Sequence, residues 1–345
     1  MAVTIIDVAK EANVSKSTVS LVINNSPRVK LETKYRVLEA IEKLGYVANI
    51  NARNLTTNKT NILGIITMVE DRKSKHYEFT AETEVFGYDV SIGIPNGLKG
   101  TDYGLLTERF YYDDSGKDVP IIIKSNRVDG VFIVGGLFQD PFIRAIKERD
   151  IPIVVVGRTY HGVDCVVADV EMGAYISAKH LIETGHKSIY YINCPVKFSS
   201  NHDRKVGYER AINEHCDVLD EYGIVNTEHN TGEGGYEAIQ QLWESGVCPE
   251  GVVAANDSIA LGIMRYFYEK NIRIPDDVSI VSYEDSVLSG YSAPALTTVN
   301  FDKELMGEEA CRILLNRIQR PKSKYVSLTL PVSLTIRNSV KRRRH

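Results

Sequence analysis

The sequence has few of the features that mark several protein classes. Only five of its 345 residues are cysteine, and they are scattered between positions 165 and 311 without a CxxC pair. This pattern disfavours both a disulfide framework and a structural zinc site. No apolar run approaches the roughly 18 residues that a membrane-spanning helix needs. Asp7, Lys10 and Glu11 come too early for a signal peptide. We therefore expect a cytoplasmic protein with reduced thiols, without a membrane segment.

Catalytic and metal-binding signatures are also missing from the sequence. It contains no GxSxG elbow, no GxxxxGKS phosphate loop and no HExxH motif, and its eight histidines are scattered. The run Gly232-Glu-Gly-Gly235 is too weak a match to a glycine-rich motif to count as a cofactor loop. We expect no enzymatic activity, no cofactor and no metal.

The charge is unevenly distributed along the chain. The net charge of the chain is -4. Residues 1–59 contain nine Lys/Arg and five Asp/Glu, so the net charge of this part is +4 and that of the remainder is -8. A chain of 345 residues is longer than a domain with a single hydrophobic core usually is, so at least two folding units are expected. A small basic head on an acidic body suits a head that meets a polyanion, although chance scatter of surface charge would give the same numbers.

The first 47 residues show the pattern of three short helices. Asn13 stands at a turn and tolerates a left-handed conformation, and Ser15 is a good N-cap for the helix that follows. A third helix is expected from Glu32 to Leu44. The apolar residues expected inside are Ile5, Ile6, Ala9, Ala12, Val19, Val22, Ile23, Val37, Leu38, Ile41 and Leu44.

The face of the second helix that remains outside carries Lys16, Ser17, Ser20 and Leu21. A helix that enters the major groove of DNA needs thin side chains and groups that bond to bases and phosphates. This pattern predicts a helix-turn-helix DNA-binding head. The alternative is a three-helix scaffold with an incidentally polar face.

The head resembles that of a known family. The runs Thr4-Ile-Ile-Asp-Val-Ala9, Thr18-Val-Ser20, Val37-Leu-Glu-Ala-Ile-Glu-Lys-Leu-Gly-Tyr46 and Ala52-Arg-x-Leu55 are similar to the headpiece of the lac repressor / galactose repressor (LacI-GalR) family of bacterial transcription regulators. The resemblance implies that Lys16, Ser17 and Leu21 contact bases. It implies phosphate contacts for Thr4, Ser20, Asn24, Lys30 and Thr33.

The sequence departs from the family pattern at two positions of this region. Leu21 stands where the family usually has Arg, so a bidentate guanine contact is lost and an apolar contact to a thymine methyl is the most it offers. Ala48 stands where the family often has Pro before the hinge, which loosens the hinge when DNA is absent.

Residues 48–60 are expected to form a hinge and linker. The run from Asn49 to Leu55 is too short and polar to hold together as an isolated helix. In the family the equivalent stretch becomes helical on operator DNA, which implies that Asn49, Ala52 and Leu55 enter the minor groove, with Leu55 as a wedge. A plain linker is the alternative.

From position 61 the sequence has the pattern of an α/β fold, in which short apolar runs alternate with amphipathic helices. Expected strands are Ile62 to Met68, Val90 to Ile94, Gly130 to Val134, Ile153 to Val156, Ile189 to Ile192, Val252 to Ala255 and Ser279 to Ser282. Expected helices are Pro141 to Arg149, Gly173 to Glu183, Arg204 to His215, Tyr236 to Glu244, Ser258 to Lys270 and Lys303 to Arg317.

The resemblance continues through this body, with Arg127-Val-Asp-Gly130, Arg204-x-x-Gly-Tyr208 and Ala255-Asn-Asp257 among its markers. It implies a two-lobed periplasmic-binding-protein-like domain with parallel doubly wound sheets over 61–338, which binds an effector and dimerises. Residues 339–345 are expected to be a solvated basic tail.

Four residues at strand ends are candidates for an effector site. Arg204, placed at the start of its helix, offers a five-donor fork, while Asn256 and Glu284 follow two strands and supply an amide and an acceptor. The resemblance places these three at ligand positions, and Arg158 is expected beside them. The set suits a sugar-type effector. Pairing of Arg204 with a surface carboxylate is the alternative, and Asp257 is expected to be the N-cap of the following helix.

The ligand contacts that the family makes in its first lobe cannot be assigned to residues of this chain, because the 68–87 segment diverges from the family pattern. We expect three aromatic side chains of this region to pack within the protein rather than to stack on a sugar ring: Tyr77, Phe79 and Tyr103. The prediction is a homodimeric repressor that holds double-stranded, pseudo-palindromic operator DNA and is released by a sugar-type effector. The alternative is a catabolite-control-type regulator whose DNA binding is enhanced by a phosphorylated carrier protein or a corepressor metabolite.

Overall fold

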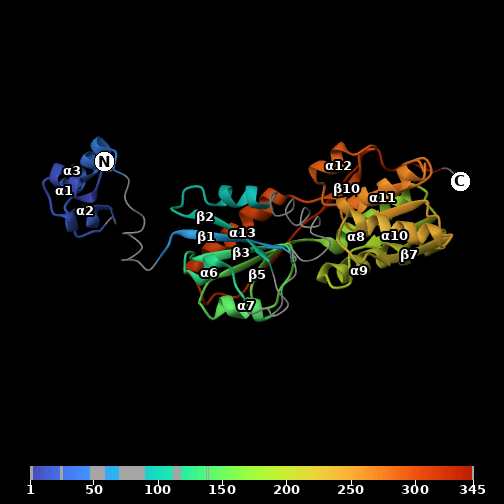
Figure 1. Cartoon of the computed structure of the whole chain (residues 1–345), viewed down its shortest axis with the longest axis horizontal. Coiled ribbons are helices and arrows are strands. Elements are labelled where there is room, and N and C mark those ends of the chain that lie inside the picture. Colours follow the sequence, from blue (N-terminus) through green and yellow to red (C-terminus); the bar gives the residue numbers. More distant parts are fainter. Residues whose placement is uncertain are drawn as a thin grey trace. The chain divides into compact units, whose positions relative to one another are not determined.

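The computed structural model describes residues 3–23, 26–46, 59–69, 90–111, 118–136, 138 and 140–343. The chain forms two compact units, Met1–Asn61 and Ile62–His345 (Figure 1). Several residues named in the sequence analysis lie outside the described residues: Asn24, Ala48, the hinge residues Asn49, Ala52 and Leu55, and Tyr77 and Phe79.

The first unit holds the helices α1 (Ile5–Glu11), α2 (Lys16–Ile23) and α3 (Leu31–Leu44). The turn between α1 and α2 is fixed as expected, because Asn13 adopts a left-handed φ of 51° and the Ser15 Oγ accepts from the Thr18 backbone N–H at 3.1 Å. The helices enclose a core of small apolar residues: Val8, Ala9, Ala12, Val19, Val22, Val37 and Ala40.

Two residues expected inside this unit are exposed. Ile6 is 52% exposed and Leu38 is 43% exposed, whereas Val8 and Ala40 are buried. Each helix of so small a unit buries only a narrow stripe of positions three and four apart, and Ile6 and Leu38 lie one residue outside their stripes. The prediction was wrong for these two residues.

The second unit contains two six-stranded sheets. The first sheet has the strand order β11-β5-β4-β3-β1-β2, with parallel pairing throughout. The second sheet has the order β12-β10-β9-β8-β6-β7, and within it β12 alone runs antiparallel to its neighbour. The strands of the first sheet are β1 (Ile62–Val69), β2 (Gly104–Tyr111), β3 (Gly130–Val134), β4 (Ile153–Val156), β5 (Asp164–Ala168) and β11 (Ser327–Leu330). Those of the second are β6 (Ser188–Asn193), β7 (Glu221–Asn226), β8 (Gly251–Ala254), β9 (Ser279–Tyr283), β10 (Thr297–Asn300) and β12 (Ser333–Thr335).

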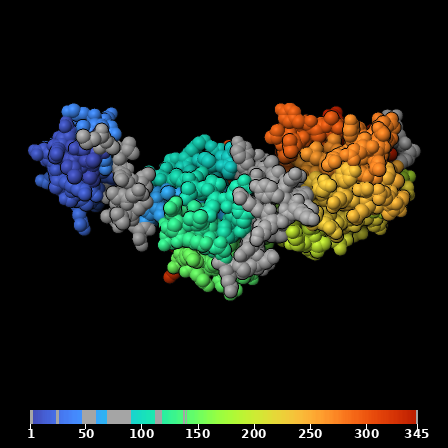
Figure 2. Space-filling model, viewed as in Figure 1, coloured from blue at the N-terminus to red at the C-terminus, as the bar shows by residue number. Residues whose placement is uncertain are grey.

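Each sheet forms a lobe with its helices. The first lobe includes α6 (Ile121–Lys124), α7 (Asp140–Lys147) and α13 (Lys303–Gln319). The second lobe, coloured yellow to orange in Figure 2, includes α8 (Val170–Glu183), α9 (Ser199–Glu214), η2 (Cys216–Val218), α10 (Gly232–Glu244), α11 (Asp257–Glu269) and α12 (Val287–Tyr291). The helices α8 and α9 approach closely at Gly207, where a Cβ would lie 1.9 Å from the Glu171 carbonyl oxygen. This explains the glycine of the Arg204-x-x-Gly-Tyr208 motif.

The chain passes between the two sheets three times. It leaves the first sheet after β5, returns after β10 into α13, and crosses again between β11 and β12. The helix α13 packs on β3, β4 and β5, and Figure 1 shows it among the strands of the first lobe. The first and third crossings are joined by a hydrogen bond from the Asp169 N–H to the Leu330 carbonyl oxygen at 3.0 Å.

The predicted α/β fold with a helical head is confirmed, and six of the seven expected strands and all six expected helices are present. The strand expected from Val90 to Ile94 is wrong, since residues 90–97 are helical. Val90, Ile94 and Leu98 are buried and lie four apart, which is the spacing of a helix face. Gly93 lets this helix contact α13, since a Cβ there would lie 1.9 Å from the Glu304 carbonyl oxygen.

The expected solvated tail is only partly correct: Lys341 and Arg342 are exposed, but the segment up to residue 343 is bonded to the second lobe. Ser339 is fully buried, and its hydroxyl donates to the Ile280 carbonyl at 2.6 Å and accepts from the Thr297 N–H at 2.8 Å. Lys341 pairs with Asp276 at 2.5 Å, and the Arg343 N–H donates to the Thr184 carbonyl at 2.8 Å. Acidic and carbonyl acceptors on the second lobe therefore hold this basic segment. Among the described helices, none combines the length and apolar character needed to cross a membrane.

Candidate DNA-reading face and effector site

The outer face of α2 carries thin side chains. Val19 and Val22 turn into the core, whereas Lys16, Ser17 and Leu21 are exposed and Ser20 is half-buried. The Ser17 hydroxyl lies 2.8 Å from the hydroxyl of the cap residue Ser15. With no aromatic or branched side chain on this face except Leu21, the helix axis can come close to base edges in a groove.

Three candidate phosphate contacts lie at helix N-termini, where unpaired N–H groups and the helix dipole attract anions. Lys30 is the N-cap residue of α3, Thr33 lies in its first turn, and Thr4 caps α1. The Thr4 hydroxyl, however, donates to the Asp7 carboxylate at 2.7 Å, and this bond lowers the pKa of Asp7. The hydroxyl proton of Thr4 therefore bonds within the head, and Thr4 caps α1 in this structure.

Arg158 follows β4 at the carboxyl edge of the first sheet. Its guanidinium lies 4.5 Å from the centre of the Phe138 ring, a cation–π distance. Its Nε is buried and has no hydrogen-bond partner among the described residues. Burial lowers the pKa of this arginine.

Arg204 lies in the second turn of α9, not at its start as expected, because α9 begins at Ser199. It is only 8% exposed, and its Nη1 donates to the Ser200 hydroxyl at 2.7 Å and to the Cys194 Sγ at 3.7 Å. The guanidinium lies 5.2 Å from the centre of the Tyr283 ring. Its Nε and the Tyr283 hydroxyl are buried without a hydrogen-bond partner in the described part of the chain.

Arg204 forms no ion pair of hydrogen-bonding length with a surface carboxylate among the described residues, which excludes the alternative considered above for that part of the chain. Burial acts to lower the pKa of Arg204, but the neighbouring Cys194, Tyr191, Tyr283 and Glu284 raise it overall. The guanidinium therefore stays charged in a largely desolvated position. Such a group gains most from an oxygen-rich ligand.

Asn256 caps α11, a role expected for Asp257. The Asn256 Oδ1 accepts from the Ile259 N–H at 2.8 Å, and its Nδ2 donates to the Asn230 Oδ1 at 3.0 Å. Asp257 is instead the first residue of the helix, and its buried carboxylate accepts from Ser282, from Thr298 and from the Ser286 N–H. The prediction that Asp257 is the N-cap was wrong because the chain enters the helix one residue earlier.

Glu284 directly follows β9 and is half-buried. Its φ of 107° is rare for a residue with a side chain, and its N–H donates to the Val299 carbonyl at 2.9 Å. Strained positions of this kind concentrate at functional sites. Thus Arg204, Asn256 and Glu284 all lie at or beyond the carboxyl edge of the second sheet, where ligands collect in doubly wound folds.

Comparison with known proteins decides the family. The family of bacterial regulatory proteins, lacI family, matches residues 4–49, and the periplasmic binding protein-like domain matches residues 178–340. The probable HTH-type transcriptional repressor ExuR of Bacillus subtilis (strain 168) is 31% identical over 344 residues, which cover 99% of both chains. The chain belongs to the LacI family. It is a DNA-binding transcription regulator, as the resemblance implied.

Solved structures agree with the fold of this LacI-family regulator. The complex of the transcriptional regulator CelR with cellobiose is 28% identical, with a TM-score of 0.69 over 98% of this chain and 99% of that one. The lac repressor dimer bound to operator and the anti-inducer ONPF is 24% identical, with a TM-score of 0.79 over 99% and 100%. The second match shows the shared fold.

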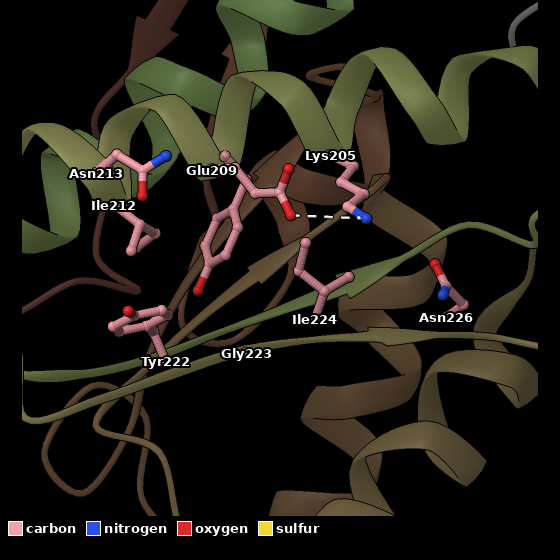
Figure 3. A pocket seen from close by; sticks show the side chains of 9 residues that line it. Lys205, Glu209, Ile212, Asn213, Tyr222, Gly223, Ile224 and Asn226 are labelled. Atoms are coloured by element: carbon pink, nitrogen blue, oxygen red, sulfur yellow. Dashed lines mark ion pairs between the residues drawn. The ribbon is translucent and has the colours of Figure 1, made fainter. Parts of the chain in front are cut away.

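Sequence reasoning missed the aromatic and sulfur neighbours of the two arginines in this LacI-family chain, namely Phe138, Tyr283 and Cys194. The signal for Tyr283 was its place directly before Glu284. A separate hollow of about 630 Å³ between α9 and β7 was also unexpected (Figure 3). Ile212 and Ile224 are among its lining residues, as are Lys205 and Glu209, whose charged atoms are 3.6 Å apart. Because these two charges pair with each other, the hollow offers no unmatched charge.

Proposed function

We propose that this LacI-family regulator represses transcription by holding a pseudo-palindromic operator as a homodimer, and that a sugar-type effector releases it. The observation that carries the effector site is the pair of arginines at strand carboxyl edges. Each guanidinium lies over an aromatic ring, and each has a buried Nε without a partner among the described residues. Buried donors left unpaired are costly, and a ligand oxygen would satisfy them.

On the DNA side, Lys16, Ser17 and Leu21 would read base edges from α2. Phosphate contacts would come from Ser20, Lys30 and Thr33, together with Thr4 and Asn24 as the family pattern implies. Asn49, Ala52 and Leu55 would enter the minor groove. The exposed side chains of α2 and the helix N-termini of Lys30 and Thr33 support this assignment. Two-fold pairing of heads would match a palindromic site.

On the effector side, the four residues provide both donors and acceptors. Arg158 and Arg204 donate, and the Glu284 carboxylate accepts from hydroxyl groups. Asn256 would act in part through its cap on α11, since its amide already bonds to Ile259 and Asn230. CelR, a relative in structure, was solved with the sugar cellobiose. A sugar bound here would favour one arrangement of the lobes and so change operator affinity.

The test is the variant Arg204→Ala. A thermal-shift series with cellobiose, D-ribose and D-galacturonate identifies a binding probe, because a ligand confined to the folded state raises the melting temperature. Fluorescence anisotropy with a duplex selected from a random pool then gives operator affinity. Arg204→Ala should keep that affinity and lose the response to the probe.

The matched control is Arg210→Ala, on the same helix. Arg210 is half-buried, pairs with Glu171 at 2.7 Å and lies 4.4 Å from the centre of the Tyr175 ring, so its contacts differ from those of Arg204. This variant should respond as the unchanged protein does. A normal response of Arg204→Ala would show that the effector site lies elsewhere. Tighter operator binding on adding the probe would favour corepression in place of release.

A further inference from the structure

The loop of residues 284–286 joins β9 to α12 and is fixed along its whole length. Glu284 has a φ of 107° and Asp285 a φ of 48°, so two successive residues with side chains are left-handed. The three backbone N–H groups are each bonded: Glu284 to the Val299 carbonyl at 2.9 Å, Asp285 to the Thr298 hydroxyl at 3.3 Å, and Ser286 to the Asp257 carboxylate at 2.7 Å. Glu284 therefore cannot move independently of the rest of this loop.

Asp285 bonds to three separate parts of the chain. Its Oδ1 accepts from the Arg337 Nη2 at 2.6 Å, and its Oδ2 accepts from the Thr335 hydroxyl at 3.2 Å. Its carbonyl oxygen accepts from the Lys303 Nζ at 3.3 Å. The Ser289 hydroxyl, in α12, also donates to Oδ1 at 3.3 Å. The Asp285 side chain is 14% exposed and that of Arg337 is 25% exposed, so this ion pair is only partly screened by water.

Two of these partners lie in elements that directly follow the segments crossing between the lobes. Lys303 is the first residue of α13, which packs on β3, β4 and β5 of the first sheet. Thr335 ends β12, which is separated from β11 of the first sheet by only two residues. Asp285 thus lies one residue from Glu284 and is bonded to the two elements, α13 and β12, that follow the second and third crossings.

We infer that Asp285 is a positioning residue that couples the Glu284 loop to the interlobe crossings, so that a change at Glu284 reaches the first lobe through Lys303 and Thr335. The inference rests on the proposed effector role of Glu284. Coupling between distant sites requires a contiguous physical connection between elements that change together. Here that connection consists of charge-assisted and neutral hydrogen bonds from a single side chain and its carbonyl.

The first test uses no effector. Asp285→Asn keeps the left-handed backbone, which Asn tolerates, but turns an amide N–H toward the donor Arg337 or Thr335. Hydrogen–deuterium exchange of the full chain should show faster exchange, by about fivefold or more, in residues 297–303 and 333–337 as well as in the loop. The control Asp276→Asn, which removes the exposed pair with Lys341, should leave these segments unchanged. Faster exchange confined to residues 284–289 would overturn the coupling.

The second test measures signal transmission with cellobiose, D-ribose and D-galacturonate as probes. Asp285→Asn, and Thr335→Val as a milder variant, should keep probe affinity within about threefold while the probe-induced change in operator affinity falls by about fivefold or more. Calorimetry and anisotropy give the two quantities. Equal loss of both, or loss of neither, would contradict a coupling role. If no probe binds the unchanged protein, the proposed sugar-type effector is contradicted. The hydrogen–deuterium exchange measurement still tests the coupling through Asp285.

Discussion

At the scale of single residues, Leu21 sets this regulator apart from the family pattern. It is 39% exposed on the face of α2 that we propose reads DNA, and an apolar side chain cannot make the bidentate contact to guanine that an arginine makes. Leu21→Arg should therefore change the preferred base at one position of each half-site toward guanine, by about tenfold in relative affinity. Selection from a random duplex pool, followed by anisotropy on the two best sites, measures this shift.

The control for that variant is Leu38→Arg, which adds the same charge at an exposed position of α3. It should raise affinity for all duplexes to a similar degree, since added charge acts on phosphates without regard to sequence. An unchanged base preference in Leu21→Arg would remove Leu21 from the base-reading set.

His186 provides a prediction on pH. It is 1% exposed, its Nδ1 lies 2.9 Å from the Leu181 carbonyl oxygen, and burial is the main reason that its pKa is lowered from 6.5 to about 4. Because the native state favours the neutral ring, the unfolded state binds more protons between these values. The contribution of His186 to stability is complete above pH 6.5 and is lost as the pH falls toward 4, at roughly 1.4 kcal/mol per pH unit at most.

Urea unfolding between pH 4.5 and 7.5 measures this dependence. His186→Gln should flatten the acid slope of the free energy of unfolding, whereas His161→Gln, at an exposed position, should leave it intact. An identical slope in all three proteins would mean that other groups control acid stability.

The sequence predicted turns and helix caps well where the signal is local. Asn13 and Ser15 are read from their own turn and helix start, and both behave as expected. The neighbours of Arg204 and the partners of Asp285 include residues far along the chain: Tyr283 lies 79 positions from Arg204, and Arg337 lies 52 positions from Asp285. Spacing along a single chain carries no information on such contacts, so they required the structure.

At the scale of elements, one buried ion pair fastens α13 to the first sheet. The Arg317 Nε and Nη2 donate to the two carboxylate oxygens of Asp164 in β5, at 2.8 and 3.0 Å, and the two side chains are 7% and 1% exposed. Removing one partner leaves a buried charge uncompensated. Arg317→Met should lower the free energy of unfolding by about 3 kcal/mol or more.

A matched control lies on the same helix. Arg312 pairs with Glu309 at 2.5 Å but is 64% exposed, so Arg312→Met should cost less than about 1 kcal/mol. Denaturant unfolding of both variants compares the two. Equal losses would show that the Asp164 pair contributes no more than a surface pair.

Most of the strands that the sequence failed to predict share a physical cause. Four of the missed strands, namely β2, β7, β11 and β12, are at the edges of their sheets, where one side carries solvent and the apolar pattern is weak. β2 has a mixed burial pattern and β7 is largely exposed or half-buried. Central strands such as β3 and β4 are buried throughout, and their apolar runs identified them.

At the scale of the whole molecule, we expect the two units to have different functions. The body has three apolar clusters of its own, and the basic head carries the predicted DNA contacts. A fragment of residues 62–345 should therefore keep its probe-induced rise in melting temperature and lose measurable affinity for DNA. Differential scanning fluorimetry and anisotropy test the two halves of this statement.

The full chain should in turn lose DNA affinity steeply between 50 and 200 mM salt, by about a factor of 10 or more, since phosphate contacts release counterions. Retention of DNA binding by the fragment would place the nucleic-acid contacts in the body and contradict the role of the head.

Among the described residues of the head, the buried side chains are all valine or alanine, and this has a practical consequence for stability measurements. The single tryptophan of the chain, Trp243, packs edge-on against Phe267 at 5.2 Å in the second lobe. Intrinsic tryptophan fluorescence will therefore report unfolding of the second lobe and will not detect unfolding of the head. A thermogram can look intact after the protein has stopped recognising its operator.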